Sequence, residues 1–437
     1  MNQKPTVPAD CKVAILGFGT VGQSVVRILT QNTPPGLKLT HIYNRRIEEK
    51  KVAWVPSTVT WTDDVNSILS SDVDVVVELI GGTDPAEHWI RKALEAGKSV
   101  VTANKQVIAE SGPELIELAI RHGQTISFEA SVAGGVPVVR GLEEGLSGDR
   151  LFRIVGILNG TCNFILTQME TSGETLDEAV KNAQNRGLAE ADPAADIDGL
   201  DARAKLAILS WIGLGYHLKP TSIVSRSIRT IEAIDFAYAA RLDCTIRQIS
   251  LVERGDGNNI LASVQPALVP TLSPLAAVQG SQNLIMVTGE FGGETGFFGY
   301  GAGGDPTAVA VVSDLIGIVS RRQSPLPSVR KKSASSIEAV GNLTTPHYLR
   351  FTVKDSSYII ASLAEILSRH NINIGSVLQE PGEDKNALPF VITLEACSSS
   401  VVEQALSDIK ALDFHVKTPV SLPMFPNLLM HYARGEC

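Results

Sequence analysis

The sequence has few cysteines, no excess of positive charge and no long apolar run. Its five cysteines are scattered and form no CxxC pair, which argues against a disulfide framework and against a zinc site. The formal net charge of −9 and the pI near 5.5 argue against nucleic acid or an anionic membrane as the main partner. No uncharged apolar run reaches membrane-spanning length, and the start MNQKPTVPADCK lacks a signal-peptide pattern. We therefore expect a soluble cytoplasmic protein.

The 437 residues are enough for two or three domains, and the first third has an α/β pattern. Short apolar runs alternate there with helical patterns, which predicts a parallel sheet covered by helices on both faces. The expected strands are 12–16, 39–43, 73–79, 99–102 and 125–129, with one helix at 113–122.

The rest of the chain predicts a mixed region, a linker and a small terminal unit. Residues 151–158 and 283–289 are expected strands of a second sheet, and a glycine-rich loop and apolar helix at 299–320 should return to the first domain. Residues 321–346, rich in Ser, Pro, Lys and Arg, form the expected linker. Beyond it, strand (348–353), helix (359–370), strand (374–379), strand (388–395), helix (399–412) and strand (416–420) follow in ferredoxin-like order.

The stretch GFGTVG (17–22) directly follows the first strand and opens a helix, as the dinucleotide-binding fingerprint requires. Gly17 permits the tight turn, Gly19 lets a pyrophosphate approach the backbone, and Gly22 permits close packing of helix and strand. A bare GxGxxG can also form a plain tight turn. The position of this motif between a strand and a helix favours cofactor binding instead.

Two arginines follow the second strand, where NAD-binding sites usually carry an acid about 20 residues beyond the glycines. The sequence has Asn44, Arg45 and Arg46 at this point, and arginine suits a 2′-phosphate by charge and geometry. Glu48 and Glu49 lie close by, so NAD stays open as the alternative to NADP.

Lys105, in VVTANKQ (100–106), immediately follows a buried strand. Ligands of open α/β sheets lie at the carboxyl ends of the strands, which favours a role for Lys105 at the cofactor over ordinary solvation.

The run GLAEADPAADIDGLDARAKLAILSWIG (187–213) leads several acids into a helix at 200–214 that is apolar beyond its first turns. Asp201 and Lys205 are four residues apart and share a face of that helix. The helix dipole and burial disfavour a charge on Lys205 while the acids favour it, a balance that suits a proton donor. For Asp198 and Arg203 an ordinary helix start is the better interpretation.

Two further motifs have less specific interpretations. FEASVAGGVPVV (128–139) is either a hinge or a loop of carbonyl groups around a hard cation, and the residues alone favour the hinge. Cys162 in GILNGTCNFIL invites a thiol-nucleophile interpretation, but no histidine lies near it in sequence, so a buried and inert thiol is expected.

The order and spacing of six motifs resemble homoserine dehydrogenases of the monofunctional type with a C-terminal ACT domain. The motifs are GFGTVG, VVTANK, NGTCN, GLAEADPAADIDGLDARAKL, PTLSPLAAVQG and GAGGDPTA. The resemblance implies reversible NAD(P)H-dependent reduction of L-aspartate 4-semialdehyde to L-homoserine, in threonine, methionine and isoleucine biosynthesis. The implied domains are a Rossmann-type dinucleotide-binding domain (1–132), an α+β substrate-binding and dimerisation domain (133–298), the returning segment (299–320), the linker (321–346) and a ferredoxin-like ACT domain (347–437).

The same resemblance implies roles for individual residues. Lys205 would be the proton donor, and Lys105 a catalytic residue that also contacts the cofactor. The substrate-binding residues would be Glu190, Asp196, Asp201 and Thr161. The cofactor-binding residues would be Gly17, Phe18, Gly19, Thr20, Val21, Gly22, Arg45, Thr102, Lys105 and Gly303. A sodium ion would be bound by Glu129, Val132, Gly134 and Val136, largely through main-chain oxygens.

The resemblance also implies partners. A homodimer or homotetramer is expected, with threonine as effector of the ACT domain and with no nucleic acid or membrane partner. Ser357 and Tyr358 stand where the family has a Pro-Gly pair, and a tyrosine there would fill the pocket that glycine leaves open. The alternatives are another amino-acid or semialdehyde dehydrogenase and a non-catalytic NADP-binding amino-acid sensor.

Overall fold

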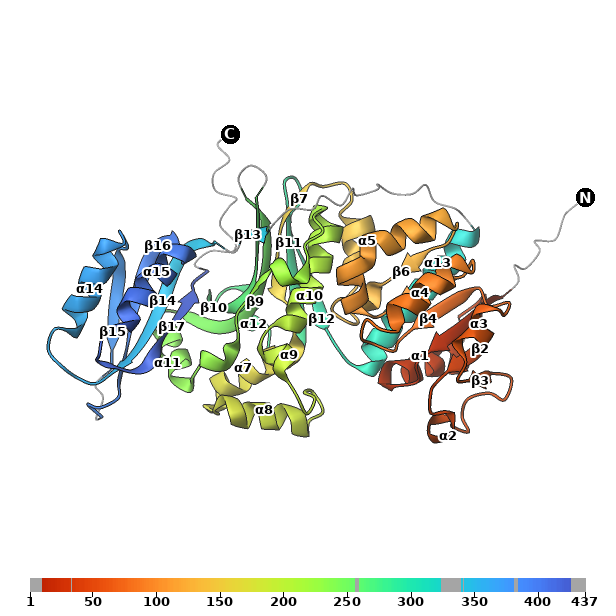
Figure 1. Ribbon diagram of the computed structural model, residues 1–437, viewed down its shortest axis with the longest axis horizontal. Helices are drawn as coiled ribbons and strands as arrows, with labels where there is room; N and C mark the ends of the chain where they lie inside the picture. Colours follow the sequence, from red (N-terminus) through yellow and green to blue (C-terminus); the bar gives the residue numbers. More distant parts are fainter. Residues whose placement is uncertain are drawn as a thin grey trace, which may run out of the picture. The chain divides into compact units, whose positions relative to one another are not determined.

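The chain folds into two compact units. Figure 1 shows the computed structural model of the protein. The structure describes residues 10–32, 34–255, 259–323, 339–340, 342–380 and 384–425. Unit 1 comprises the described residues of 1–154, 204–222 and 283–338, and unit 2 comprises those of 155–203, 223–282 and 339–437. Residues 324–338 and 341 of the expected linker lie outside the described residues. Within the described ranges, no helix is both long and apolar enough to cross a membrane.

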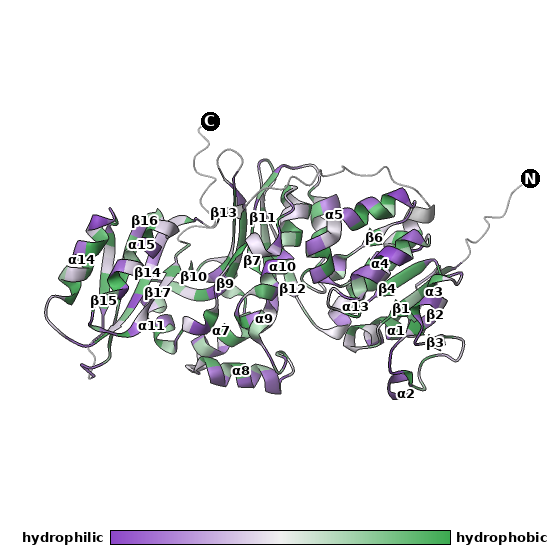
Figure 2. Ribbon diagram, viewed as in Figure 1, coloured by the Kyte–Doolittle hydropathy of each residue, from purple (hydrophilic) through white to green (hydrophobic). Residues whose placement is uncertain are grey.

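Unit 1 contains a parallel sheet of six strands in the order β3-β2-β1-β4-β5-β6, the doubly wound order of dinucleotide-binding folds. The strands are β1 (Cys11–Leu16), β2 (Leu37–Tyr43), β3 (Thr60–Thr62), β4 (Val75–Glu78), β5 (Ser99–Thr102) and β6 (Ile126–Ser127). Figure 2 shows β1 and β4 as hydrophobic strands, as expected for strands covered on both faces. The expected parallel sheet is confirmed, and β3 is an addition to it.

Helices cover this sheet, and the last of them comes from a distant part of the chain. They are α1 (Thr20–Gln31), α2 (Ile47–Lys50), α3 (Val65–Leu69), α4 (Ala86–Glu95), α5 (Lys105–Arg121) and α13 (Gly304–Gln323). Buried residues of α13 such as Val311 and Leu315 share a core with Val25 of α1 and Val13 of β1. The helix expected at 113–122 in fact begins at Lys105, because Asn104 accepts the N–H of Val107 as its N-cap and Pro113 lies inside the helix.

A second, mixed sheet has the order β12-β11-β7-β9-β10-β13, with β8 beside β10. Its strands are β7 (Leu151–Ile157), β8 (Val224–Ser225), β9 (Cys244–Arg254), β10 (Ile260–Pro270), β11 (Gln282–Gly289), β12 (Gly293–Tyr300) and β13 (Ala339–Val340). The strands expected at 151–158 and 283–289 correspond to β7 and β11. The short strand β13 falls within the expected linker and pairs in parallel with β10.

Most of the remaining helices of the central region are short. They are η1 (Glu129–Ser131), α6 (Val138–Arg140), η2 (Gly141–Gly145), α7 (Gly160–Ser172), α8 (Leu176–Asn185), α9 (Ala194–Ile197), α10 (Leu200–Leu209), η3 (Ser210–Leu214), η4 (Pro220–Ser222), η5 (Ile228–Thr230), α11 (Ala233–Arg241) and α12 (Pro274–Ala277). Together α10 and η3 span the helix expected at 200–214, which is confirmed.

The C-terminal part of unit 2 has the expected βαββαβ order. Its elements are β14 (Thr344–Val353), α14 (Ile359–Arg369), β15 (Ile374–Gln379), β16 (Leu388–Ser398), α15 (Ser399–Lys410) and β17 (His415–Pro423). The four strands form an antiparallel sheet in the order β15-β16-β14-β17, and this ferredoxin-like arrangement confirms the expected fold. Leu349, Phe351 and Val353 of β14 share a core with Leu363 of α14 and Leu406 of α15.

Tyr358 immediately precedes α14 in a left-handed backbone conformation, with φ of +75°. Its side chain is 81 % exposed. The expectation that this ring fills a pocket is therefore not met within the chain.

We predict that Tyr358→Gly is more stable than Tyr358→Ala by about 1 kcal/mol, because only glycine adopts this conformation without steric cost. Both variants lose the exposed ring, so the difference between their stabilities comes from the backbone conformation alone. Thermal unfolding of the full chain checks this prediction, and an alanine variant that melts at or above the glycine variant would contradict it.

Candidate active site

The glycine loop between β1 and α1 is shaped by close backbone approaches. Gly17 has φ of +107°, and a Cβ there would lie 2.7 Å from the carbonyl oxygen of Leu79. A Cβ on Gly22 would lie 2.2 Å from the carbonyl oxygen of Gly17, so neither position accepts a side chain without movement. A Cβ on Gly19, the N-cap of α1, would meet no atom within 4 Å. This open N-terminus has no acid in its first turn and fits the pyrophosphate of a dinucleotide.

The side chains within the same loop have different environments. Phe18 is 1 % exposed and packs edge-on against Trp61, with the ring centroids 4.9 Å apart. Its side chain therefore belongs to the core, and only its backbone is available to a ligand. Thr20 is exposed and Val21 is half-buried.

The returning helix α13 begins beside α1. Gly303 precedes it with φ of +118°, and a Cβ on Gly304 would lie 2.9 Å from the Cγ2 atom of Thr20. The hydroxyl of Ser24 donates to Asp305 Oδ1 at 2.6 Å and joins the two helix starts. Gly303 and the glycine loop thus adjoin within unit 1.

The two arginines beyond β2 differ in their interactions. The Nη1 atom of Arg46 lies 3.2 Å from Glu49 Oε2, and its backbone N–H donates to Asn44 Oδ1 at 2.9 Å. Arg45 is exposed and, among the residues that the structure describes, has no ion-pair partner.

A buried carboxylate that the sequence analysis did not single out organises the ends of β4 and β5. Glu78, which is fully buried, accepts the N–H of Ile80 at 2.7 Å and the hydroxyl of Thr102 at 2.6 Å. The Thr102 hydroxyl in turn accepts the N–H of Asn104 at 2.9 Å. Thr102 therefore links the ends of the two strands. The feature of the sequence that could have identified Glu78 is an acidic residue at the end of an apolar strand.

The two lysines both lie in unit 1. Lys105 is the first residue of α5 and is half-buried. Lys205 on α10 is 8 % exposed, although it is a lysine, and Leu206 beside it is fully buried. A Cβ on Gly112 of α5 would lie 2.6 Å from the ring of Trp211, so the absence of a side chain there lets α5 approach the end of this helix.

Two carboxylates of the acidic run, those of Asp196 and Asp201, are held by one amide in unit 2. The Nδ2 atom of Asn159 donates to Asp196 Oδ1 at 2.6 Å and to Asp201 Oδ2 at 2.8 Å. Its Oδ1 atom accepts the N–H of Cys162 at 2.6 Å and caps α7. This pair of hydrogen bonds brings Asp196 and Asp201 together, and it was not predicted because the partners lie far from Asn159 in the sequence.

Two other residues of the expected substrate site lie at the edge of this group. The hydroxyl of Thr161 donates to the carbonyl of Leu188 at 2.8 Å and anchors the acidic loop. Glu190 is exposed, and its carbonyl accepts from Gln184 at 3.1 Å. Asp198 is ion-paired with Arg229 at 3.0 Å, in line with a structural role.

Cys162 is fully buried at the start of α7. Burial and the negative charges of Asp196 and Asp201 raise the pKa of its thiol well above the usual value. A thiol in this environment is a poor nucleophile, which agrees with the expectation of an inert cysteine.

The loop at 129–136 combines a buried acid with a tightly curled backbone. Glu129 is 4 % exposed, and burial raises the pKa of its carboxyl to about 7. Its two carboxylate oxygens accept the N–H groups of Val139 at 2.9 Å and Arg140 at 2.8 Å. Ala133 and Gly134 have φ of 53° and 51°. No group of three or more His, Cys, Asp and Glu side chains is placed to hold a metal in the described parts of the chain.

Comparisons with known proteins agree with this architecture. Family models match in three places, namely the NAD-binding domain of homoserine dehydrogenase (17–129), homoserine dehydrogenase (137–316) and the ACT domain (347–414). A homoserine dehydrogenase of Synechocystis is 38% identical in an alignment of 418 residues that covers 92% of this chain and 96% of that relative.

Solved structures show the same likeness. The homoserine dehydrogenase of Thiobacillus denitrificans has a TM-score of 0.88 and 30% identity, covering 95% of this chain and 98% of that one. A hyperthermophilic archaeal homoserine dehydrogenase in complex with NADPH has a TM-score of 0.62 and 29% identity, covering 74% of this chain and 100% of that one.

We predict that Asn159→Asp lowers the free energy of unfolding by about 2 kcal/mol near neutral pH, because the amide donor is replaced by a third carboxylate. Aspartate caps a helix as well as asparagine does, so the change isolates the contacts to Asp196 and Asp201. Protonation of one carboxyl group restores a hydrogen-bond donor, so the loss in free energy of unfolding should shrink as the pH falls from 8 to 5. Unfolding followed by circular dichroism at several pH values tests this, and a deficit independent of pH would contradict it.

Proposed function

Because this chain belongs to the homoserine dehydrogenase family, it is an NAD(P)-dependent oxidoreductase that interconverts L-aspartate 4-semialdehyde and L-homoserine, and we propose which residues carry the reaction. A nicotinamide cofactor supplies or accepts the hydride at the carbonyl carbon. The observation that carries the assignment is a lysine that is 8 % exposed on a helix that is apolar beyond its first turns.

Lys205 acts in this proposal as the proton donor to the carbonyl oxygen. Reduction of an aldehyde places negative charge on that oxygen, and an ammonium shielded from water stabilises the charge better than one in bulk solvent. The burial of Lys205 and the apolar side chains that follow it support this role. In the reverse direction the neutral amine accepts the proton from the hydroxyl of homoserine.

The acidic group binds the ammonium of the substrate. Asp196 and Asp201 are joined by Asn159, which keeps two carboxylates close despite their mutual repulsion. Glu190 lies on the adjoining loop, and Thr161 anchors that loop through Leu188. These contacts support the assignment of Glu190, Asp196, Asp201 and Thr161 to the substrate.

The nucleotide is bound at the glycine loop, with residues 17–22 around its pyrophosphate and Gly303 beside it. Lys105 stands at the carboxyl end of β5, where a positive charge near the cofactor and the substrate carbonyl assists both binding and catalysis. Thr102 positions this edge through its hydrogen bonds to Glu78 and Asn104. The loop geometry fits a dinucleotide, because side chains at Gly17 and Gly22 would clash with the backbone.

The coenzyme is NADP in this proposal, with Arg45 as the residue that binds the 2′-phosphate. Arg46 is engaged by Glu49, whereas Arg45 is exposed and has no ion-pair partner in the described chain. The NADPH complex of the archaeal relative supports the same coenzyme class.

A sodium ion bound by Glu129 and the carbonyl groups of Val132, Gly134 and Val136 fits the loop at 129–136. A buried carboxylate whose pKa is raised by desolvation gains from a nearby cation, and the left-handed backbone of Ala133 and Gly134 curls the chain. The ion would have a structural role, connecting this loop to α6.

The remaining expectations concern the whole assembly. We propose a homodimer or homotetramer in the cytoplasm, with the ACT domain as the amino-acid-sensing part and threonine as its effector. The separation into domains at residues 132, 298, 320 and 346 is proposed on the same basis.

Lys205→Met is predicted to lower kcat by about 10² to 10⁴-fold, because it removes the proton donor and keeps a side chain of similar length. The dissociation constant of NADPH should change little. Lys219→Met, at an exposed lysine beyond the same helix, serves as the matched control and should keep its kcat. Steady-state kinetics and fluorescence titration give both quantities, and a Lys205→Met enzyme with normal kcat would remove this lysine from the mechanism.

Arg45→Ala should raise KM for NADPH about tenfold or more and leave KM for NADH nearly unchanged, because only NADPH carries the 2′-phosphate. Arg46→Ala is the matched control, since Arg46 is already paired with Glu49. Initial rates with each nucleotide decide the matter. Equal losses for both nucleotides in Arg45→Ala, or a larger effect in Arg46→Ala, would refute the assignment.

A further inference from the structure

The ferredoxin-like sheet of unit 2 is covered on both faces. Leu349, Phe351 and Val353 of β14 face the core formed with α14 and α15. Because side chains alternate along a strand, Tyr348, Arg350 and Thr352 point to the opposite face. Tyr348 shares a core with residues of α7 and α11, so the main body of unit 2 packs on this second face.

A buried arginine fixes that packing. Arg350 is 2 % exposed, and its Nε atom donates to Asp235 Oδ1 at 2.7 Å. Its Nη1 atom lies 3.1 Å from Glu232 Oε1, and its Nη2 atom donates to the carbonyl of Thr230 at 3.0 Å. All three nitrogens therefore have acceptors, and Arg350 serves as a fixed anchor between β14 and the start of α11.

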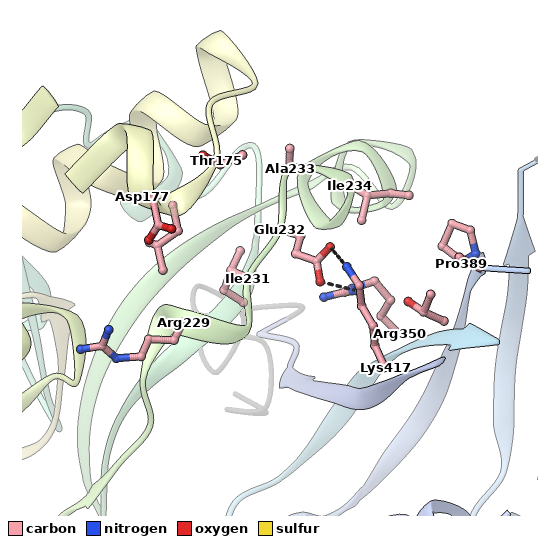
Figure 3. A pocket seen from close by; sticks show the side chains of 13 residues that line it. Thr175, Asp177, Arg229, Ile231, Glu232, Ala233, Ile234, Arg350, Pro389 and Lys417 are labelled. Carbon is pink, nitrogen blue, oxygen red and sulfur yellow. Dashed lines mark hydrogen bonds and ion pairs between the residues drawn. The ribbon is translucent and has the colours of Figure 1, made fainter. Parts of the chain in front are cut away.

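A cavity of about 560 Å³ lies beside this anchor, entirely within unit 2 (Figure 3). One side is formed by the start of α8 and the segment 229–234, and the other by the face of the sheet that bears Thr352, with Pro389 and Lys417 as its neighbours on the adjacent strands. Its volume is in the range of small-molecule sites. Its apolar lining is provided by Leu176, Ile231, Ala233, Ile234 and Pro389.

The cavity also contains an exposed ion pair that a ligand can replace. Lys417 Nζ lies 2.8 Å from Glu232 Oε2, and these side chains are 52% and 42% exposed. Figure 3 shows Arg350 and Lys417 both directed at Glu232. Exposed pairs of this kind contribute little to stability, so the cost of opening this one is small. Glu232 remains held by Arg350 when Lys417 leaves it.

We propose that this cavity binds a free α-amino acid with a short aliphatic side chain. The ligand inserts into the Lys417–Glu232 pair, with its carboxylate on Lys417 and its ammonium on Glu232. Its side chain lies on the apolar lining near Ile231, Ile234 and Pro389. A zwitterion fits better than a simple anion or cation, because each of the two separated charges receives a partner of opposite sign.

This site differs from the loop at Asp355–Tyr358, where the resemblance places the effector. It joins strands of the ferredoxin-like sheet to the segment that opens α11, so an occupied cavity changes the contacts between the sheet and the body of unit 2. The proposal concerns binding and does not depend on the assignment of catalytic residues.

Isothermal titration of the full-length protein with L-threonine, L-valine and L-isoleucine tests the proposal, with butyrate and propylamine as ligands of single charge. We expect at least one amino acid to bind and neither single-charge ligand to do so. Lys417→Met should weaken that binding about tenfold or more, and Lys417→Arg should largely restore it. Lys410→Met, at another exposed lysine of the same domain, should leave the binding unchanged.

Three outcomes would overturn the proposal. The first is that none of the amino acids binds. The second is that binding survives in Lys417→Met and is lost in Glu190→Gln, which assigns the ligand to the substrate pocket. The third is that binding survives in Lys417→Met and is lost in Ser357→Ala, which assigns it to the loop before α14. Melting temperatures near that of the parent protein show that each variant is folded.

Discussion

The burial of one lysine is the constraint on which the proposed site depends. Lys205 is 8 % exposed, and the residues that follow it on α10 are almost fully buried. Removing such a charge from water costs free energy that only nearby opposite charges offset. Asp201 lies one turn before the lysine on the same helix. In the proposed mechanism, carboxylates of the acidic run bind the ammonium of the substrate.

Aromatic side chains pack against neighbouring residues of unit 1 just beyond the helix of Lys205. Trp211 stacks on Phe128 with ring centroids 6.0 Å apart and contacts α5 at Gly112. His217 contacts the carbonyl of Ala109 at 3.1 Å, also on α5. Because α5 begins with Lys105, these contacts join the helix of Lys105 to the segment that follows the helix of Lys205. The two lysines are catalytic in the proposed mechanism, and catalytic groups need such support, since small displacements from the reactive geometry lower the rate strongly.

Features with local causes were predictable from the sequence. The glycine loop needs close approaches that only glycine allows, and the apolar composition of 200–214 indicates a buried helix. The local pattern also misled, because Pro113 resembled a helix start although Asn104, nine positions earlier in the chain, is the N-cap of α5. The strand β3 has only three residues and one apolar side chain, too few for a periodic signal.

Features that depend on distant partners were not predictable. Asn159 meets Asp196 and Asp201 only in the folded chain, and Glu78 meets Thr102 across two neighbouring strands. Arg45 and Arg46 are equivalent in a sequence argument, and only the fold pairs one of them with Glu49. Likewise, nothing in the sequence of β14 indicates that Arg350 is anchored by Asp235. Tertiary contacts of this kind determine which polar residues are structural and which remain available to a ligand.

The central claim is that this protein transfers hydride between a nicotinamide coenzyme and the carbonyl carbon of an amino-acid semialdehyde. The most direct test is the rate of NADPH oxidation by the purified protein with L-aspartate 4-semialdehyde, with L-glutamate 5-semialdehyde as the longer analogue. The account predicts rapid turnover of the aspartate compound, formation of L-homoserine and a much lower kcat/KM for the analogue. Tight binding of NADPH with no turnover, or an equal preference for the longer semialdehyde, would contradict it.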